Sequence, residues 1–351
     1  RENGYSLLGV QKALDAQERT GEAGGFAERQ RKAFAQADGK LTSEDSTISL
    51  NAAEGNGAGI LNEGDSTVTI ERSILTRNRT HASGGAFYTD GGTITVTDSE
   101  VTKNQAANGG GLYAGGAESR WGLRAHFEIT NSTIAENKAE NGGGILSDGG
   151  GHMEIADSLF TKNHASDHGA AIASEGDSNL TLTRVRVVEN ESWGEGGGVW
   201  THSTRHQKIV DSEIVDNHAG VPHIDEDGLM TDDVKGGGGL HLDGGPVLVQ
   251  GTLIEKNSAT EEGGGLSLNN LGDVVVRDST IKKNKAYDGG GLENSATRVT
   301  FERVLVQSNR AKSAGGGIYN TSSGPFRIVG STIRENSGGI GGGLANAPDN
   351  D

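Results

Sequence analysis

Apolar and polar residues alternate along most of this chain in short stretches that end at asparagine or glycine. One stretch, STIAENKAENGGGIL at 132–146, runs from an alternating segment through an asparagine to three glycines and an isoleucine. Period-two alternation that is rich in Val, Ile and Thr predicts β-strands and not helices. The same arrangement returns throughout the sequence, so the pattern is an internal repeat.

Eleven asparagines mark the repeat, and most follow one another at intervals of 25 to 27 residues. The two exceptions are intervals of 33 and 40 residues. An apolar residue stands three positions before each asparagine and a second one follows the glycines, as Val187 and Val199 do around Asn190. The marker positions are Asn51, Asn78, Asn104, Asn137, Asn163, Asn190, Asn217, Asn257, Asn284, Asn309 and Asn336.

Each unit therefore holds three short strands, which bury an apolar face only when successive units stack. This predicts an all-β fold, a right-handed, single-stranded parallel β-helix of about eleven coils. Neighbouring coils should lie about 4.8 Å apart, which makes a rod about 50 Å long. Residues 1–44 lack the repeat and have a helix-forming composition, so we expect a partly helical N-terminal cap there and the β-helix over 45–351.

The asparagines and glycines fall at the corners of the predicted coil. Glycine supplies the positive-φ conformations and the close backbone approach that such corners need. An asparagine side chain at a corner can hydrogen-bond to the coils above and below, in a ladder. We therefore interpret both residue types as structural.

Composition and charge exclude several classes of protein. The formal net charge is -17, from 31 Lys and Arg against 48 Asp and Glu, which argues against nucleic acid and membrane-surface partners. The sequence contains no cysteine, which excludes disulfides, thiolate zinc sites and cysteine nucleophiles. No stretch approaches the roughly 20 apolar residues that span a bilayer, so we do not expect a membrane-spanning protein.

The two long intervals place insertions at 117–125 and 219–235, on opposite edges of the strand that follows the glycines. Side chains alternate along a strand, so the residues one and three positions after an inward residue such as Leu240 face outward. Between the insertions these outward positions combine aromatic rings, imidazoles and carboxylates, which suits a sugar ring and its hydroxyl groups. We predict a carbohydrate-binding face formed by Tyr113, Asp148, Trp200, His202, His241 and Asp243.

The same face has a second interpretation, as the active site of a polysaccharide lyase or a glycoside hydrolase. A lyase needs a base and a group that neutralises a uronate carboxylate, whereas a hydrolase needs two carboxyl groups about 5 to 9.5 Å apart. The candidate catalytic residues are His202, His241, Asp243 and Glu175, with Arg205, Lys208 or Lys235 to neutralise charge.

The second insertion is acidic and contains an Asp-x-Asp-Gly segment at 225–228. Carboxylate oxygens are the ligands that calcium prefers. Asp225, Asp227 and Asp232 are therefore candidate calcium ligands, and the sequence indicates no other cofactor.

Short motifs in the repeat add a resemblance to a known family. SLFTKN at 158–163 carries the motif FxxN, and SGGAFY at 83–88 is close to GGA followed by an apolar residue. These motifs resemble the repeats of the polymorphic outer membrane proteins, and residues 46–346 are more broadly similar to right-handed parallel β-helix repeat proteins. The resemblance implies an extracellular or cell-surface protein that adheres or scaffolds.

Overall fold

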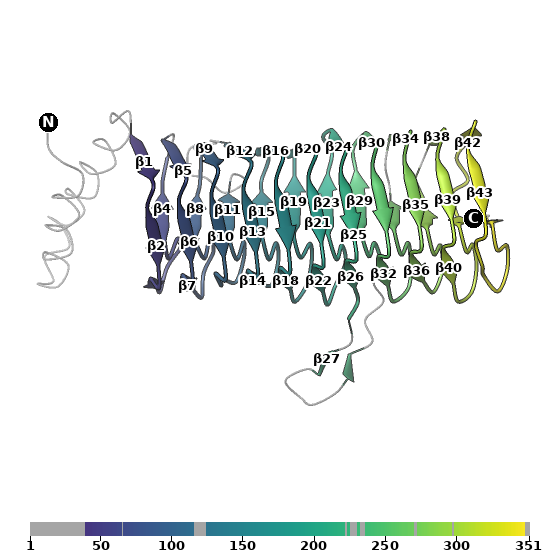
Figure 1. Ribbon diagram of the computed structural model, residues 1–351, viewed down its shortest axis with the longest axis horizontal. Helices are drawn as coiled ribbons and strands as arrows, with labels where there is room; N and C mark the ends of the chain where they lie inside the picture. Colours follow the sequence, from purple (N-terminus) through teal and green to yellow (C-terminus); the bar gives the residue numbers. More distant parts are fainter. Residues whose placement is uncertain are drawn as a thin grey trace, which may run out of the picture.

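The computed structural model describes residues 39–64, 66–115, 124–221, 223–224, 230–231, 236–269, 272–296 and 298–347. These residues form 44 β-strands and no helix, and they stack coil on coil into a rod (Figure 1). Three parallel sheets of eleven strands each run along the rod, which confirms the predicted β-helix. Most of the predicted N-terminal cap lies outside the described residues.

Each coil contributes strands to sheets A, B and D, and most coils also contribute a short strand to sheet C, between B and D. Sheet A consists of β1 (Lys40–Glu44), β5 (Thr67–Glu71), β9 (Gly92–Thr97), β12 (Ala125–Thr130), β16 (His152–Ala156), β20 (Asn179–Thr183), β24 (Gln207–Val210), β30 (Val247–Gln250), β34 (Asp273–Arg277), β38 (Arg298–Glu302) and β42 (Phe326–Val329). Sheet B consists of β2 (Thr47–Ser49), β6 (Ile74–Thr76), β10 (Glu100–Thr102), β13 (Thr133–Ala135), β17 (Leu159–Thr161), β21 (Arg186–Val188), β25 (Glu213–Val215), β31 (Leu253–Glu255), β35 (Thr280–Lys282), β39 (Leu305–Gln307) and β43 (Thr332–Arg334). Strand β1 falls within the segment 1–44 that we assign to the cap, and it pairs with β5 along its whole length.

Sheet D, which follows the glycines, is the third long sheet. It consists of β4 (Ile60–Asn62), β8 (Phe87–Thr89), β11 (Leu112–Gly115), β15 (Ile145–Asp148), β19 (Ile172–Gly176), β23 (Val199–Ser203), β29 (Leu240–Gly244), β33 (Leu266–Asn269), β37 (Leu292–Asn294), β41 (Ile318–Asn320) and β44 (Leu344–Asn346). The two-residue strands of sheet C, too short for alternation to reveal, are β3 (Ala52–Ala53), β7 (Arg79–Thr80), β14 (Lys138–Ala139), β18 (His164–Ala165), β22 (Glu191–Ser192), β26 (His218–Ala219), β32 (Ser258–Ala259), β36 (Lys285–Ala286) and β40 (Arg310–Ala311).

The inward side chains of sheets A, B and D form one continuous core along the rod. Val199 and Leu240 are fully buried in it and lie opposite each other on neighbouring strands. The side of sheet D that faces the core also carries polar residues. Near the C-terminal end, Asn294 Nδ2 donates to Asn320 Oδ1, and Asn320 Nδ2 donates to Asn346 Oδ1. The sequence analysis did not predict this second ladder.

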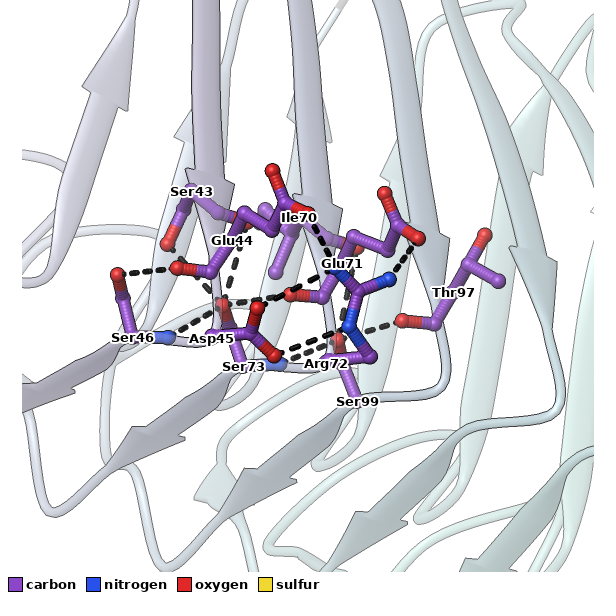
Figure 2. A network of polar contacts seen from close by, with 10 residues as sticks. All are labelled: Ser43, Glu44, Asp45, Ser46, Ile70, Glu71, Arg72, Ser73, Thr97 and Ser99. Carbon is purple, nitrogen blue, oxygen red and sulfur yellow. Dashed lines mark hydrogen bonds and ion pairs between the residues drawn. The ribbon is translucent and has the colours of Figure 1, made fainter.

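The corner between sheets A and B is held by serine hydroxyls (Figure 2). The backbone N–H of Ser46 donates to Ser73 Oγ at 3.1 Å, and that of Ser73 donates to Ser99 Oγ at 3.0 Å. On the outside of this corner the Arg72 guanidinium pairs with Asp45 at 2.9 Å and also contacts Glu44 and Glu71. These ionic contacts are exposed, so the buried serine bonds are the more stabilising part of the corner.

The corner between sheets B and C carries the predicted asparagine ladder. Asn163 donates its backbone N–H and its side-chain Nδ2 to Asn190 Oδ1, at 2.9 and 3.0 Å. Asn190 in turn donates Nδ2 to Asn217 Oδ1 at 2.9 Å and to the carbonyl of Phe160 at 3.1 Å. The same pairing joins the marker asparagines from Asn51 to Asn336, so their interpretation as structural is confirmed.

We expected glycine to supply the positive φ angles at the corners, but other residues supply them at two corners. Asp157 has φ 51° between sheets A and B, and Lys162 has φ 55° between sheets B and C, so residues other than glycine adopt the left-handed conformation there. Glycine serves the corner before sheet D, where Gly142 has φ 61°. The next glycine, Gly143, is needed for close approach instead, because a Cβ there would lie 2.4 Å from the His164 carbonyl oxygen.

Replacing Gly142 by alanine is expected to destabilise the rod by about 2 kcal/mol. The new Cβ would lie 2.5 Å from the Ile145 carbonyl oxygen, in addition to the strain of a positive φ. The matched control is Glu136→Gly, because Glu136 has φ 57° and glycine tolerates that angle at least as well. Urea unfolding followed by circular dichroism measures both changes, and equal midpoints for the two variants would contradict the prediction.

One end residue of each predicted insertion belongs to a strand of the rod. Ala125 already belongs to β12, and Ala219 still belongs to β26. Within the second insertion, β27 (His223–Ile224) and β28 (Met230–Thr231) form an antiparallel pair. Figure 1 shows this pair projecting away from the rod beyond β26.

Candidate functional site

The outward face of sheet D has the register that the sequence predicted. Trp200 lies opposite His241, and His202 lies opposite Asp243, on the neighbouring strands β23 and β29. Glu175 on β19 is the neighbour of His202 on the other side. The strand pairing therefore brings together the residues predicted from column positions, and their role in binding or catalysis stays a prediction.

Three columns of side chains run along this face, parallel to the rod. The middle column follows each inward residue directly and contains Tyr113, Leu146, Ala173, Trp200, His241, Ser267 and Glu293. The outer column lies two residues further on and contains Asp148, Glu175, His202, Asp243 and Asn269. The corner column precedes the positive-φ glycine of each coil and contains, from Asn141 onward, Asn141, His168, Glu195, Gly236, Glu262 and Asp288.

The middle column faces outward, yet all of its members except the half-buried Tyr113 are buried. Leu146 is 3 % exposed and Trp200 is 9 % exposed, and the two pack with Ala173 and Tyr113 in an apolar cluster outside the main core. Tyr113 stacks on Tyr88 of the preceding coil, with ring centroids 5.1 Å apart. Trp200 therefore offers little surface on which a sugar ring could stack, which limits the platform that we expected there.

The outer column supplies accessible polar groups that are fixed by contacts between coils. The Tyr113 hydroxyl donates to Asp148 Oδ2 at 3.2 Å, and His202 Nδ1 lies 2.9 Å from Asp243 Oδ2. The side chain of His202 is 67 % exposed, so a ligand can reach the imidazole ring, in contrast to the buried indole of Trp200. Burial and the neighbouring charge of Asp148 raise the pKa of Glu175.

Glu195 in the corner column is a contact centre that the sequence analysis missed. Its Oε2 accepts a hydrogen bond from Trp200 Nε1 at 3.1 Å and lies 3.6 Å from His241 Nε2 and 4.0 Å from His168 Nδ1. The His168 ring stacks on Trp200, with centroids 4.7 Å apart and planes 8° from parallel. Trp200 thus holds Glu195 and His168 in place, which indicates a supporting role for the indole.

His241 is a neutral imidazole at the centre of the face. Burial lowers its pKa, against the opposing effect of Glu195 and Asp243. Its Nε2 also lies 3.4 Å from Asn269 Nδ2, whereas its Nδ1 is buried and has no hydrogen-bond partner. A buried nitrogen without a hydrogen-bond partner costs free energy in either tautomer of the ring.

Carboxyl groups continue beyond His241 toward the C-terminal end. Glu293 is 3 % exposed, and the hydroxyls of Ser267 and Thr321 lie 3.4 and 3.2 Å from its oxygens. Burial, with the nearby charge of Glu262, raises the pKa of Glu293 to about 8. Partial burial and the carboxylates around it raise the pKa of Glu262 as well.

Other predicted residues lie apart from this face or outside the described chain. Lys208 is exposed on sheet A, and Arg205 pairs with Asp177 at 3.5 Å. Lys235 and the candidate calcium ligands Asp225, Asp227 and Asp232 lie outside the described residues. Among the residues that are described, no group of three His, Asp or Glu side chains is arranged to hold a metal ion.

No helix in the described residues is long and apolar enough to cross a membrane. Stacked parallel coils that carry a polar outer face define the class of β-solenoid proteins. Residues 120–337 match the family model for the right-handed β-helix region, which is more than half of the chain. The chain belongs to the right-handed β-helix family. Comparison with curated proteins found no match, and comparison with solved structures found none either.

Proposed function

We propose that this protein binds carbohydrate along the outward face of sheet D and that it acts outside the cell, as a secreted or surface-exposed rod. The observation that carries the proposal is the fixed row of polar side chains in the outer column. Asp148 and Asp243 are each held by a ring from a neighbouring coil, Tyr113 and His202 respectively. Groups that are already oriented lose little conformational entropy when they bind sugar hydroxyls.

Replacing His202 by alanine is expected to weaken glycan binding about tenfold, because it removes an exposed ring and frees Asp243 to move. His202 is largely exposed, so the substitution leaves the core unchanged. Screening on a glycan array, followed by calorimetry with the best glycan, measures the effect. His218→Ala is the control, because His218 is also partly exposed but lies in sheet C.

If no glycan binds the parent protein, the binding function is rejected and a purely structural rod remains. If His218→Ala weakens binding as much as His202→Ala, the ligand lies on another face. Either result contradicts the proposal.

Glycoside hydrolysis is a second candidate, favoured by two carboxyl groups in the outer column. Asp148 and Glu175 occupy equivalent positions on neighbouring strands, about 4.8 Å apart along the rod, and the pKa of Glu175 is raised. A carboxyl group with a raised pKa close to a second carboxyl group is the arrangement that a retaining glycosidase uses. An assay of each bound glycan for new reducing ends tests for hydrolysis. Glycans that stay intact after long incubation would reject hydrolysis and leave binding as the only proposed function.

A further inference from the structure

Exposed cations gather near the C-terminal end of the rod, around the strands β32, β36 and β40 of sheet C. In earlier coils, cations at the corners pair with carboxylates of neighbouring coils, as Lys162 does with Glu189 at 3.7 Å and Arg184 with Asp157 at 2.6 Å. The later coils instead carry a basic patch, although the net charge of the chain is -17. The basic patch consists of the exposed residues Lys256, Lys283, Lys285, Arg310 and Lys312.

The register of the coils brings these cations together. Lys256 and Lys283 are the positive-φ residues of the corner between sheets B and C on neighbouring coils, with φ 60° and 56°. Lys285 lies directly opposite Arg310 on β36 and β40, one strand spacing of about 4.8 Å away. Like charges directly opposite each other on neighbouring strands are destabilising. A bound anion would remove this repulsion.

Most of these cations keep their charge available to a ligand. Lys283 Nζ pairs with Glu255 Oε1 at 3.0 Å. The side chains of Lys256, Lys285 and Arg310 form no ion pair with any residue that the structure describes. Three cations of the patch therefore have no carboxylate to neutralise them.

The carboxylates that border the patch are occupied by other donors. Asp288 Oδ1 accepts the backbone N–H of Ala314 at 2.6 Å. Glu335 Oε2 accepts a hydrogen bond from Gln307 Nε2 at 2.6 Å. These contacts hold both carboxylates in place, so the chain itself leaves the cations of the patch to be neutralised from outside.

Tyr287 is a second observation that points to a ligand at the patch. Its ring is 45 % exposed, and between Ile74 and Ile328 no other large hydrophobic side chain among the described residues is exposed. Lys312 Nζ lies over this ring, 5.4 Å from its centroid. An exposed ring with cations around it suits a sugar that carries anionic groups, because a sugar packs an apolar face on such a ring.

We propose that the basic patch binds a glycan that carries sulfate or phosphate ester groups, with more than one negative charge for each sugar ring. Lys285 and Arg310 bind one ester group together, because a guanidinium donates two parallel hydrogen bonds to an oxyanion and an ammonium adds another. The other lysines of the patch contact neighbouring ester groups, and a sugar ring lies against Tyr287. This site is separate from the face of sheet D and does not depend on the function proposed there.

The shape of the rod favours a glycan over an anionic membrane. Figure 1 shows β32, β36 and β40 along the edge of the rod from which the pair that contains β27 projects. A flat bilayer would meet this pair before it reached the basic patch, whereas a glycan chain can lie beside the pair.

A glycan also fits better than a single-stranded nucleic acid. Binding of a single strand uses several aromatic rings on which successive bases stack, and Tyr287 is the only aromatic residue that we assign to the patch. The net charge of -17 does not prevent binding of a short anionic glycan, because charges more than about 8 Å away are largely screened at physiological salt.

The experiment is calorimetry at physiological salt with oligomers of equal length. The probes are dextran sulfate, dextran phosphate, unmodified dextran and oligogalacturonate, which has one charge for each sugar. We expect dextran sulfate or dextran phosphate to bind at least about tenfold more tightly than oligogalacturonate, and the tighter of the two identifies the ester. The double variant Lys285→Gln, Arg310→Gln should weaken that binding by at least about tenfold.

The matched control is the double variant Lys162→Gln, Arg184→Gln. It removes the same charge from side chains that already pair with carboxylates in earlier coils. This control should bind the chosen probe within about twofold of the parent. If it weakens binding as much as Lys285→Gln, Arg310→Gln does, the effect comes from net charge and the inference is overturned.

The contact with a sugar ring has its own test. Tyr287→Ser should weaken binding of the chosen probe about fivefold, whereas Tyr287→Phe, which keeps the ring, should bind like the parent. Equal binding by Tyr287→Ser and the parent would overturn the placement of a sugar on this ring.

The remaining outcomes decide between ligands. Oligogalacturonate that binds as tightly as both esters overturns the requirement for more than one charge for each sugar. Tighter binding of single-stranded oligothymidylate, or of phosphatidylserine vesicles, overturns the inference in favour of a nucleic acid or a membrane. If neither dextran ester binds, the inference fails, while binding of uncharged glycans to sheet D is tested independently by His202→Ala.

Discussion

Replacing Asn190 by alanine is expected to destabilise the middle of the rod by about 4 kcal/mol, because several buried groups lose a partner together. The backbone N–H of Asn163 loses its acceptor, and the carbonyl of Phe160 loses the donor that lies 3.1 Å away. Each buried group left unpaired costs about 1 to 3 kcal/mol. Asn190 is fully buried, so no solvent replaces the missing bonds.

Amide hydrogen exchange is the suitable measurement, because a solenoid opens locally and not as one unit. Peptides from the coils that contain Asn163 and Asn217 should lose protection, and distant coils should keep it. Asn51→Ala is the control, because Asn51 is exposed and, among the described residues, its side chain donates to Asn78 alone, so the loss should stay below about 1 kcal/mol. Unchanged protection in the Asn190 variant would contradict the structural account of the ladder.

Glu293 is expected to make the stability of the rod depend on pH. Its folded pKa of about 8 lies above the ordinary value of 4.5, so folding favours the protonated form. The contribution to stability is therefore complete below pH 4.5 and is lost as the pH rises toward 8 and beyond. A shift of this size corresponds to about 3 kcal/mol or more for a buried carboxyl group.

The test compares Glu293→Gln with the parent across the pH range. Glutamine keeps the shape of a protonated carboxyl group and its contacts with Ser267 and Thr321, so the variant should equal the parent near pH 4 and exceed it in stability at pH 9. Glu100→Gln, at an exposed position of sheet B, controls for the loss of one charge. Parallel stability curves for parent and Glu293→Gln would show that Glu293 ionises freely in the fold.

The fold was predictable because one spacing repeats with little variation. Residues such as Val199 and Leu240, which are 41 positions apart, could be aligned from the asparagines alone, and the structure places them side by side. The outward pairs Trp200 with His241 and His202 with Asp243 followed from strand alternation. Alternation and repeat length together therefore define the strands and their register.

The corner column was missed because alternation ends where the strands end. Glu195 and Glu262 stand immediately before the positive-φ glycine of their coils, a position that we treated as part of the turn. The signal existed, since the equivalent residues in neighbouring coils, His168 and Asp288, are also titratable. Reading the turn as a column, in the way the strands were read, would have found them.

The sequence also could not predict that side chains on the outward face of sheet D are buried. Glu293 and Trp200 occupy outward positions of the pleat, which predicts exposure, yet both are almost fully buried. Their burial depends on side chains that the neighbouring columns bring against them, such as His168 stacked on Trp200. Such contacts depend on side-chain conformations, which a repeat pattern does not determine.

The shared register of the sheets means that the length of this protein can change in whole units. Deleting residues 164–190 would remove one full coil and bring Asn163 directly beneath Asn217, with every neighbouring strand meeting an equivalent partner. Gene duplication or loss that adds or removes such a module would alter the reach of the protein without disturbing its cross-section. Insertions and deletions in this gene are therefore tolerated best in multiples of one repeat.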